Sequence, residues 1–238
     1  MAHRTAEHRI RVPVAHSAWR WMAFAHWRVD PGAVQALLPR GLEVDTYDGA
    51  AWLSLTPFEL ADVRPGLPGL HGVDRGWSTL ETNLRTYVRR PGGADGLWFL
   101  SLDVENVLAV AGARLGVGAP YFRADLTLRR EAGTVAYSGR RIGSDADYAI
   151  ALRPGEPIEP DPLEVWLTSR WRAYTRHLGR LWMLPVEHEP WPLRAAEVVE
   201  LGETVTDAAG FEALGAPDLV HWSEGVRRVR SGAPRPCA

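Results

Sequence analysis

Hydrophobic and polar residues alternate along much of the chain. Residues 77–88, WSTLETNLRTYV, alternate strictly, with Leu80, Leu84 and Val88 in one row. The opposite row consists of polar or aromatic residues: Glu81, Asn83, Arg85 and Tyr87. The same alternation predicts strands at residues 17–30, 50–60, 97–103, 121–130, 134–142, 187–201 and 219–230.

Helix signals are fewer. An Asp-Pro pair at residues 30–31 predicts a short helix that ends at Leu38. Asp161 and Glu164 have capping-box spacing, and a stripe of large residues follows up to Gly179, which predicts a longer helix over 163–178. Residues 105–115 are a third candidate.

The order of these elements predicts the fold class. Strands dominate and follow one another through hairpins, one of them turning at the Pro-Gly-Gly-Ala-Asp-Gly segment 91–96. Strand and helix do not alternate regularly, so we expect an α+β protein built mainly from antiparallel β-structure. We expect one domain over residues 1–238, with loose tails at 1–12 and 231–238 and loops at 64–76 and 143–160.

Charge and composition exclude several classes of partner. The 27 basic residues are scattered among 29 acidic ones, so we expect no nucleic-acid partner. No apolar run has the length of a membrane span or a signal peptide, so a cytoplasmic protein without a membrane partner is expected. The single cysteine, Cys237, allows no disulfide within the chain, and no metal motif is present, so we expect neither a metal nor another cofactor. The sequence leaves open whether the chain forms a homo-oligomer.

The basic residues are all arginine. Biased codon usage explains the missing lysines, but the chemical consequence holds whatever the cause: no side chain of this protein can form a Schiff base. Gly-x-Ser-x-Gly is also absent, which disfavours a serine hydrolase of the nucleophile-elbow type. The eleven tryptophans favour packing or pocket lining over a specific ligand cage.

The polar row of residues 81–87 is either a solvated face or the wall of a pocket. It combines an acid, an amide, a guanidinium and a phenol, all of which make directional hydrogen bonds. The opposite row is interrupted by threonines, as in a strand that is covered on both faces, so we favour a pocket wall. Arg170 falls in the apolar stripe of the predicted long helix, where a structural ion pair is favoured over a ligand-binding role.

Several segments together resemble a known family. They are LPRGLEVD at 38–45, TLETNLRTYV at 79–88, residues 97–115, APYF at 119–122, LTSRWRAYT at 167–175, EHEPWPL at 187–193 and HWSEGV at 221–226. These segments resemble the YqjF-like family of uncharacterised proteins, the domain of unknown function 2071, over nearly the whole chain. That family is remotely similar to acetoacetate decarboxylase, which implies a closed antiparallel barrel with flanking helices around a partly hydrophobic pocket.

The resemblance also implies site residues. The active-site arginine and glutamate of the decarboxylase match Arg20 and Glu81, and its Schiff-base lysine matches Tyr121. We therefore take Arg20, Glu81 and Tyr121 as candidate catalytic residues. The candidate substrate-binding residues are Asn83, Arg85, Tyr87, Trp98, Arg114 and Arg170.

Three functional interpretations follow. The first is an enzyme that performs acid–base chemistry, such as isomerisation, dehydration or cyclisation, on a small carbonyl or carboxylate compound. The second is a non-catalytic protein that binds a small molecule in the same pocket. The third is a buried polar network with only a structural role. Tyr121 discriminates among them, because an acid–base residue must face the pocket whereas a binding protein tolerates it packed among aromatic rings.

Overall fold

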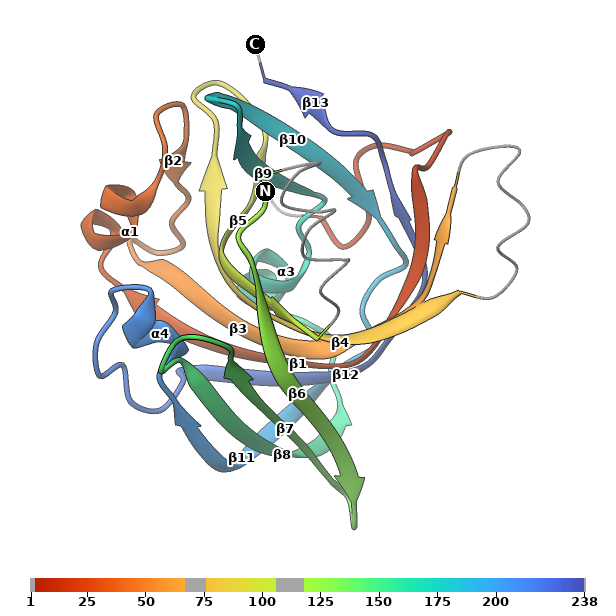
Figure 1. Ribbon diagram of the computed structural model, residues 1–238, viewed down its shortest axis with the longest axis vertical. Coiled ribbons are helices and arrows are strands. Elements are labelled where there is room, and N and C mark those ends of the chain that lie inside the picture. Colours follow the sequence, from red (N-terminus) through yellow and green to blue (C-terminus); the bar gives the residue numbers. More distant parts are fainter. Residues whose placement is uncertain (1–2, 67–75, 106–117, 238) are drawn as a thin grey trace.

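The protein is built almost entirely from strands, as the alternation predicted. The computed structural model describes residues 3–66, 76–105 and 118–237 (Figure 1). Its strands are β1 (Ala15–Val29), β2 (Glu43–Val44), β3 (Ala51–Pro65), β4 (Trp77–Arg89), β5 (Asp95–Val104), β6 (Tyr121–Glu131), β7 (Thr134–Arg141), β8 (Asp147–Pro157), β9 (Arg172–His177), β10 (Arg180–Glu187), β11 (Leu193–Glu203), β12 (Leu219–Ser231) and β13 (Arg235–Pro236). Its helices are α1 (Pro31–Leu37), α3 (Pro162–Thr168) and α4 (Val205–Ala208).

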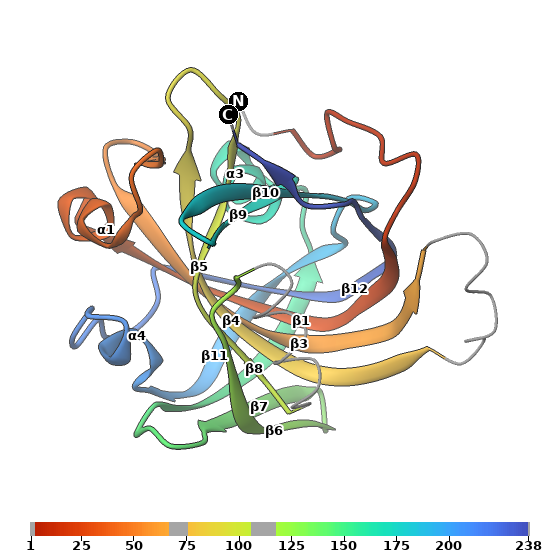
Figure 2. The same ribbon diagram turned by 45° about the horizontal axis from the view of Figure 1, so that its top comes forward.

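The sheet closes on itself. Strands β5, β4, β3, β1, β12, β10 and β9 pair in that order, and β9 returns to β5, so they form a ring. Strands β6, β7, β8 and β11 connect β5 to β12 by a second route at the opposite end of the molecule (Figures 1 and 2). The predicted closed barrel is thus confirmed. Most neighbours are antiparallel, but β5 pairs in parallel with both β6 and β9.

A bulge in β1 divides its side chains between two cores. Trp21 has a left-handed backbone with φ of 53°, and the pairing register shifts around it. Such an irregularity breaks the alternation of faces. Trp19 therefore lies with Met22 and Phe24, whereas Ala23, Ala25 and Trp27 pack in the larger core on the other side of the sheet.

The predicted long helix is wrong beyond its first two turns. The capping box forms, with Asp161 accepting from the Glu164 amide at 2.8 Å and Glu164 accepting from the Asp161 amide at 2.7 Å. The helix nevertheless ends at Thr168, and the chain continues as the β9–β10 hairpin. The local pairing of β9 with β10 and its long-range pairing with β5 together outweigh the helical spacing of the large side chains. Gly179 is consequently a hairpin-turn residue.

Other boundaries also differ from the expectation. The expected loop at 143–160 contains β8, and the strand expected at 187–201 begins only at Leu193, after Pro190 and Pro192. Proline lacks the amide hydrogen that a sheet needs, which accounts for the late start. The short helix after Asp30 and the hairpin at 91–96 are confirmed. The candidate helix at 105–115 lies, apart from its first residue, outside the described part of the chain.

The segments expected to be loose tails contact the barrel. The Ile10 amide donates to Glu187 at 2.7 Å, and β13 pairs with β10. The Trp171 indole also donates to the His3 carbonyl at 2.9 Å. Figures 1 and 2 both show the two ends of the chain beside the β9–β10 hairpin. None of the helices in the described residues is both long enough and apolar enough to cross a bilayer.

Candidate active site

The ring of strands encloses a cavity of about 480 Å³. Much of its wall is apolar, supplied by Trp19, Met22, Phe58, Leu97, Phe99 and Trp191. A larger cleft of about 770 Å³ lies elsewhere and contains none of the candidate acid–base residues. The candidate chemistry therefore belongs to the smaller, inner cavity.

The polar row of β4 lines this inner cavity. Glu81, Asn83 and Arg85 are 6%, 4% and 7% exposed, and all three belong to its wall. The opposite row, including Leu84, is buried in the apolar core. β4 lies between β3 and β5 and is covered on both faces, so its polar side chains have no access to bulk solvent except through the cavity.

Glu81 is a carboxyl group with an unusual environment. Burial raises its pKa to about 7, and the charge of Asp103 adds to this rise. Hydrogen bonds from Tyr121 and Asn83 to the carboxylate act in the opposite direction but are weaker. The Thr56 hydroxyl donates to the side-chain Oδ1 of Asn83, which orients the Asn83 amide so that its N–H groups can face Glu81. Glu81 can therefore gain and lose a proton near neutral pH.

Tyr121, the first residue of β6, faces Glu81. Its hydroxyl donates to Glu81 Oε2 over a long distance of 3.5 Å, and its position follows from the parallel pairing with Leu102. Burial, reinforced by the Glu81 charge, raises the Tyr121 pKa well above its ordinary value. The phenol therefore keeps its proton and acts as a hydrogen-bond donor in the cavity.

Arg85 is a buried cation without a counterion. It makes no ion pair with any carboxylate of the described residues, and its Nε has no hydrogen-bond partner there. Burial lowers its pKa, an effect that the nearby Tyr87 hydroxyl partly offsets. The guanidinium carbon lies 5.5 Å from the centre of the Phe24 ring. An unpaired buried charge is costly, so this wall of the cavity is suited to an anionic group of a ligand.

Arg170 contrasts with Arg85. It also lines the cavity, but its Nη1 contacts Asp45 at 2.8 Å and Asp95 at 2.6 Å. Its guanidinium carbon is stacked 4.3 Å from the centre of the Trp166 ring. Structural pairing, favoured from the sequence, thus describes most of its contacts, although Nη2 is buried without a hydrogen-bond partner among the described residues.

His188 also lines the inner cavity, although it was not among the candidate residues predicted from the sequence. Its ring centre lies 4.7 to 5.3 Å from three indole rings, those of Trp19, Trp171 and Trp191. Burial lowers the His188 pKa to about 4, so the ring is neutral near pH 7. Nδ1 contacts the Glu189 carbonyl at 2.6 Å, which requires the proton on Nδ1 and leaves Nε2 as an acceptor. Because these tryptophans are far apart in sequence, only the fold reveals this cluster.

The other candidate residues lie away from Glu81. Arg20 forms ion pairs with Asp62 and Glu59 on the face of β1 opposite Trp19, and it is not part of the cavity wall. Its expected position beside Glu81 and Tyr121 is therefore not observed, because the strand pleat directs it to the other side.

Two further candidates face away from the inner cavity, and one is not described. The Tyr87 hydroxyl bonds to the Leu167 carbonyl at 2.8 Å and to Ser54 at 2.6 Å, away from the cavity. Trp98 packs with Tyr174 on the opposite face of β5. Arg114 lies outside the described residues. Within the described residues, no group of three or more His, Cys, Asp or Glu side chains is arranged to hold a metal ion.

Comparisons with known proteins identify the family. The profile of DUF2071, described as an uncharacterised conserved protein, matches residues 16–227. The chain is 37% identical to the uncharacterised protein YqjF of Bacillus subtilis strain 168 over 236 residues, which cover 94% of this chain and 95% of that protein. Both matches extend over most of the barrel.

Solved structures with the same fold come from acetoacetate decarboxylase-like proteins. One such enzyme from Sphingomonas wittichii RW1 has a TM-score of 0.65 at 20% identity, covering 95% of this chain and 93% of that chain. The acetoacetate decarboxylase of Legionella pneumophila has a TM-score of 0.67 at 13% identity, with coverages of 98% and 92%. The enduracididine biosynthesis enzyme MppR, in complex with pyruvate, has a TM-score of 0.63 at 14% identity, with coverages of 97% and 92%. At these identities the similarity to solved structures concerns the fold alone. The family is shown by the sequence matches. The chain belongs to the DUF2071 family and has an acetoacetate decarboxylase-like barrel.

Proposed function

We propose that this protein is an enzyme that performs acid–base chemistry on a small carbonyl or carboxylate compound bound in the inner cavity. The observation that carries the proposal is the buried Glu81, whose pKa is raised to about 7 and which shares the cavity with the Tyr121 hydroxyl. A general base is most effective when its pKa is close to the working pH.

The reaction needs no covalent intermediate. The chain contains no lysine, so the imine route through a lysine side chain is closed to it. In the proposed step the Glu81 carboxylate takes a proton from the carbon next to a carbonyl group. The electrons of that C–H bond form a carbon–carbon double bond, and the π electrons of the carbonyl move to its oxygen. The Tyr121 hydroxyl donates a hydrogen bond to this developing enolate. Return of the proton to another carbon would complete an isomerisation.

Arg85 supplies the binding energy in this scheme. A substrate carboxylate would form the ion pair that the guanidinium lacks within the described protein, while the apolar wall around Trp19 and Trp191 receives the rest of the molecule. The binding of pyruvate by MppR supports this substrate class, because pyruvate carries both a carbonyl and a carboxylate.

A second candidate function is ligand binding without turnover. The unpaired Arg85 and the aromatic wall favour it as much as they favour an enzyme. A purely structural network is less well supported, because Glu81 and Arg85 are both buried in the cavity wall but form no ion pair with each other. The two functional candidates differ in whether Glu81 moves a proton.

Proton exchange tests this difference without knowledge of the natural substrate. The protein is incubated with pyruvate or 2-oxobutanoate in deuterium oxide, and loss of the proton signal next to the carbonyl is followed by NMR. We expect catalysed exchange, reduced roughly 100-fold or more by Glu81→Gln and roughly 10-fold by Tyr121→Phe. Glu131→Gln changes an exposed carboxylate and serves as the control.

Each result has a defined meaning. Exchange that Glu81→Gln leaves intact would overturn the assignment of Glu81 as the base. Saturable binding of either compound without exchange would support the binding protein instead of the enzyme.

A further inference from the structure

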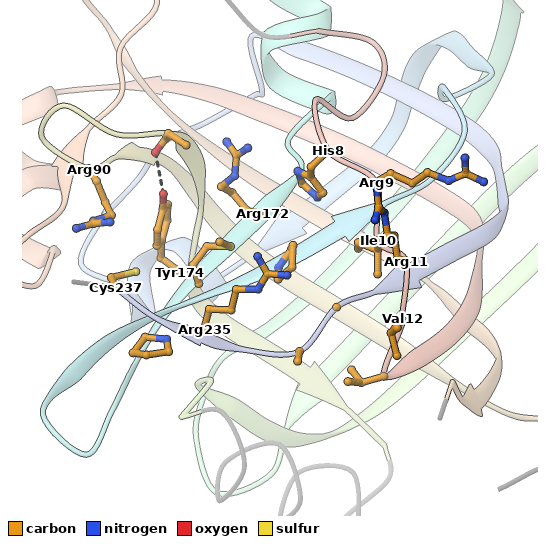
Figure 3. Close-up of a pocket in the computed structure, with 17 residues that line it drawn as sticks. His8, Arg9, Ile10, Arg11, Val12, Arg90, Arg172, Tyr174, Arg235 and Cys237 are labelled. Atoms are coloured by element: carbon orange, nitrogen blue, oxygen red, sulfur yellow. Dashed lines mark hydrogen bonds between the residues drawn. The ribbon is translucent and has the colours of Figure 1, made fainter. Parts of the chain in front are cut away.

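The second cavity lies on the outer side of the barrel wall. It is a cleft of about 770 Å³ between residues 8–14 and residues 232–237, which we name the terminal cleft (Figure 3). On the β9–β10 hairpin, Tyr174 and Met183 face the terminal cleft, whereas their neighbours Ala173 and Leu184 face the inner cavity. The hairpin thus lies between two adjacent cavities, which share Val14, Arg172, Pro185 and Gly232 in their linings.

The charged residues that line the terminal cleft are all basic. Among the described residues they are Arg9, Arg11, Arg90, Arg172 and Arg235, with His8 beside them. Acidic residues outnumber basic ones in the chain as a whole, 29 against 27, so an acid-free lining of this size departs from the average surface. Like charges gathered in one concave site produce a positive potential that attracts anions.

Not all of this charge is neutralised by the protein. Arg172 is bound by Asp95 at 3.1 Å and by Glu7 at 3.2 Å. Arg11 and Arg235 are exposed, and their guanidinium groups form no ion pair or hydrogen bond with the described residues. The cleft therefore has spare hydrogen-bond donors.

The geometry brings some of these groups together. Figure 3 shows the Arg235 side chain extending from the C-terminal segment toward the middle of the cleft, with Arg172 across from it, while Arg9 reaches away from the others. The apolar part of the lining includes Ile10, Val12, Met183 and Pro185. A ligand with a charged end and an apolar body matches both surfaces.

We propose that the terminal cleft binds a phosphorylated organic anion, with its phosphoryl group at Arg11 and Arg235 and its apolar body against Ile10 and Met183. A phosphoryl group carries up to two negative charges and three acceptor oxygens, so more than one guanidinium fork can bind it at once. A carboxylate has fewer acceptor sites and satisfies fewer of these donors. The four residues assigned to this ligand are not part of the inner cavity wall, so the proposal does not rest on the function proposed for Glu81.

Calorimetric titration with phenyl phosphate tests the proposal. In about 50 mM salt, where screening is moderate, we expect saturable binding with one site per chain. The double variant Arg11→Ala/Arg235→Ala should weaken it by roughly tenfold or more, as the loss of charge-assisted hydrogen bonds requires. Both arginines are exposed, so the variant should fold normally. Arg129→Ala, on the exposed side of β6, removes one positive charge elsewhere and should leave binding unchanged.

Four results would overturn the proposal. Two of them are the absence of saturable binding and benzoate binding as tight as that of phenyl phosphate. The other two are an equal loss of phenyl phosphate affinity in Arg129→Ala, and a loss of affinity in Arg85→Met with none in the double variant. An equal loss in the Arg129→Ala control would indicate a general charge effect, and a loss confined to Arg85→Met would move the anion to the inner cavity. Proton exchange in the inner cavity is a separate measurement, so either proposal can fail without the other.

Discussion

Glu81 shows how one residue acquires a function from its surroundings. On an exposed strand a glutamate would ionise near its ordinary pKa of 4.5, but burial between β3 and β5 raises that pKa to about 7. The folded state therefore holds the Glu81 proton more tightly than the unfolded state does. Its contribution to stability is fully present below the unfolded pKa and disappears as the pH rises through the folded pKa.

We therefore expect the wild-type free energy of unfolding to fall, relative to that of Glu81→Gln, as the pH rises from about 4.5 to about 7. The shift in pKa corresponds to at most about 3 kcal/mol over this window. Urea unfolding at a series of pH values measures the difference. A constant difference between the two proteins across the window would contradict the raised pKa.

The two cavity arginines allow a second prediction at this scale. Arg85→Met removes a buried cation that has no ion pair within the described residues and should stabilise the fold by about 1 kcal/mol or more while abolishing carboxylate binding. Arg170→Met removes the cation that Asp45 and Asp95 share, although each keeps a second arginine, and should destabilise the fold by about 2 kcal/mol. Urea unfolding compares the two variants directly, and equal effects on stability would show that the difference in pairing has no energetic consequence.

At the scale of elements, the β9–β10 hairpin determines the shape of the site. It forms the wall between the inner cavity and the terminal cleft, and it occupies the sequence that resembled a long helix. Leu178 and Gly179 form its two-residue turn with φ of 49° and 76°. Both positions of such a turn require positive φ, which glycine and asparagine adopt more easily than leucine.

Replacing Leu178 by asparagine should therefore stabilise the protein. The leucine side chain is 86% exposed, so little packing is lost, and relief of the left-handed conformation should contribute about 1 kcal/mol. The thermal unfolding midpoint of Leu178→Asn is the measurement. Leu37→Asn, also at an exposed leucine but within helix α1, is the control and should not be stabilised. A lower midpoint for Leu178→Asn would argue against the turn geometry.

At the scale of the whole molecule, two routes around the sheet share the strands β5, β4, β3, β1 and β12. One of them, β4, carries the polar row and is covered on both faces along most of its length, whereas β6 and β7 end in an exposed hairpin at one end of the molecule (Figure 1). The candidate site is thus built on the part of the barrel with the most extensive pairing. Rigid elements hold catalytic side chains more accurately than loops do.

Hydrogen exchange should reflect this arrangement. Amides of β4 between residues 80 and 88 should exchange far more slowly than those at the β6–β7 turn, residues 130–135. The hydrogen bonds of the β4 amides break only when much of the barrel unfolds. Exchange followed by mass spectrometry of proteolytic fragments distinguishes the two. Comparable rates in both segments would mean that β4 is not part of a stable core.

The sequence alone predicted the features that depend on neighbouring residues. The alternation of residues 77–88, the turn at 91–96 and the short helix after Asp30 are local, and the structure has all three. The absence of lysine is a property of composition, and by itself it closes the imine route through a side chain. The family segments were sufficient to predict the closed barrel.

The tertiary structure decided which of these residues meet. The bulge at Trp21 and the indole cluster around His188 bring together segments that are distant in sequence, and the β9–β10 hairpin is fixed in the barrel by the pairing of β9 with β5. Arg20 was expected beside Glu81, but the pleat of β1 directs it to Asp62 on the other face. Period-two alternation specifies two faces of a strand but not what lies against each face. Burial exists only once the ring of strands has closed. It is burial that sets the pKa of Glu81 and leaves Arg85 without an ion pair among the described residues.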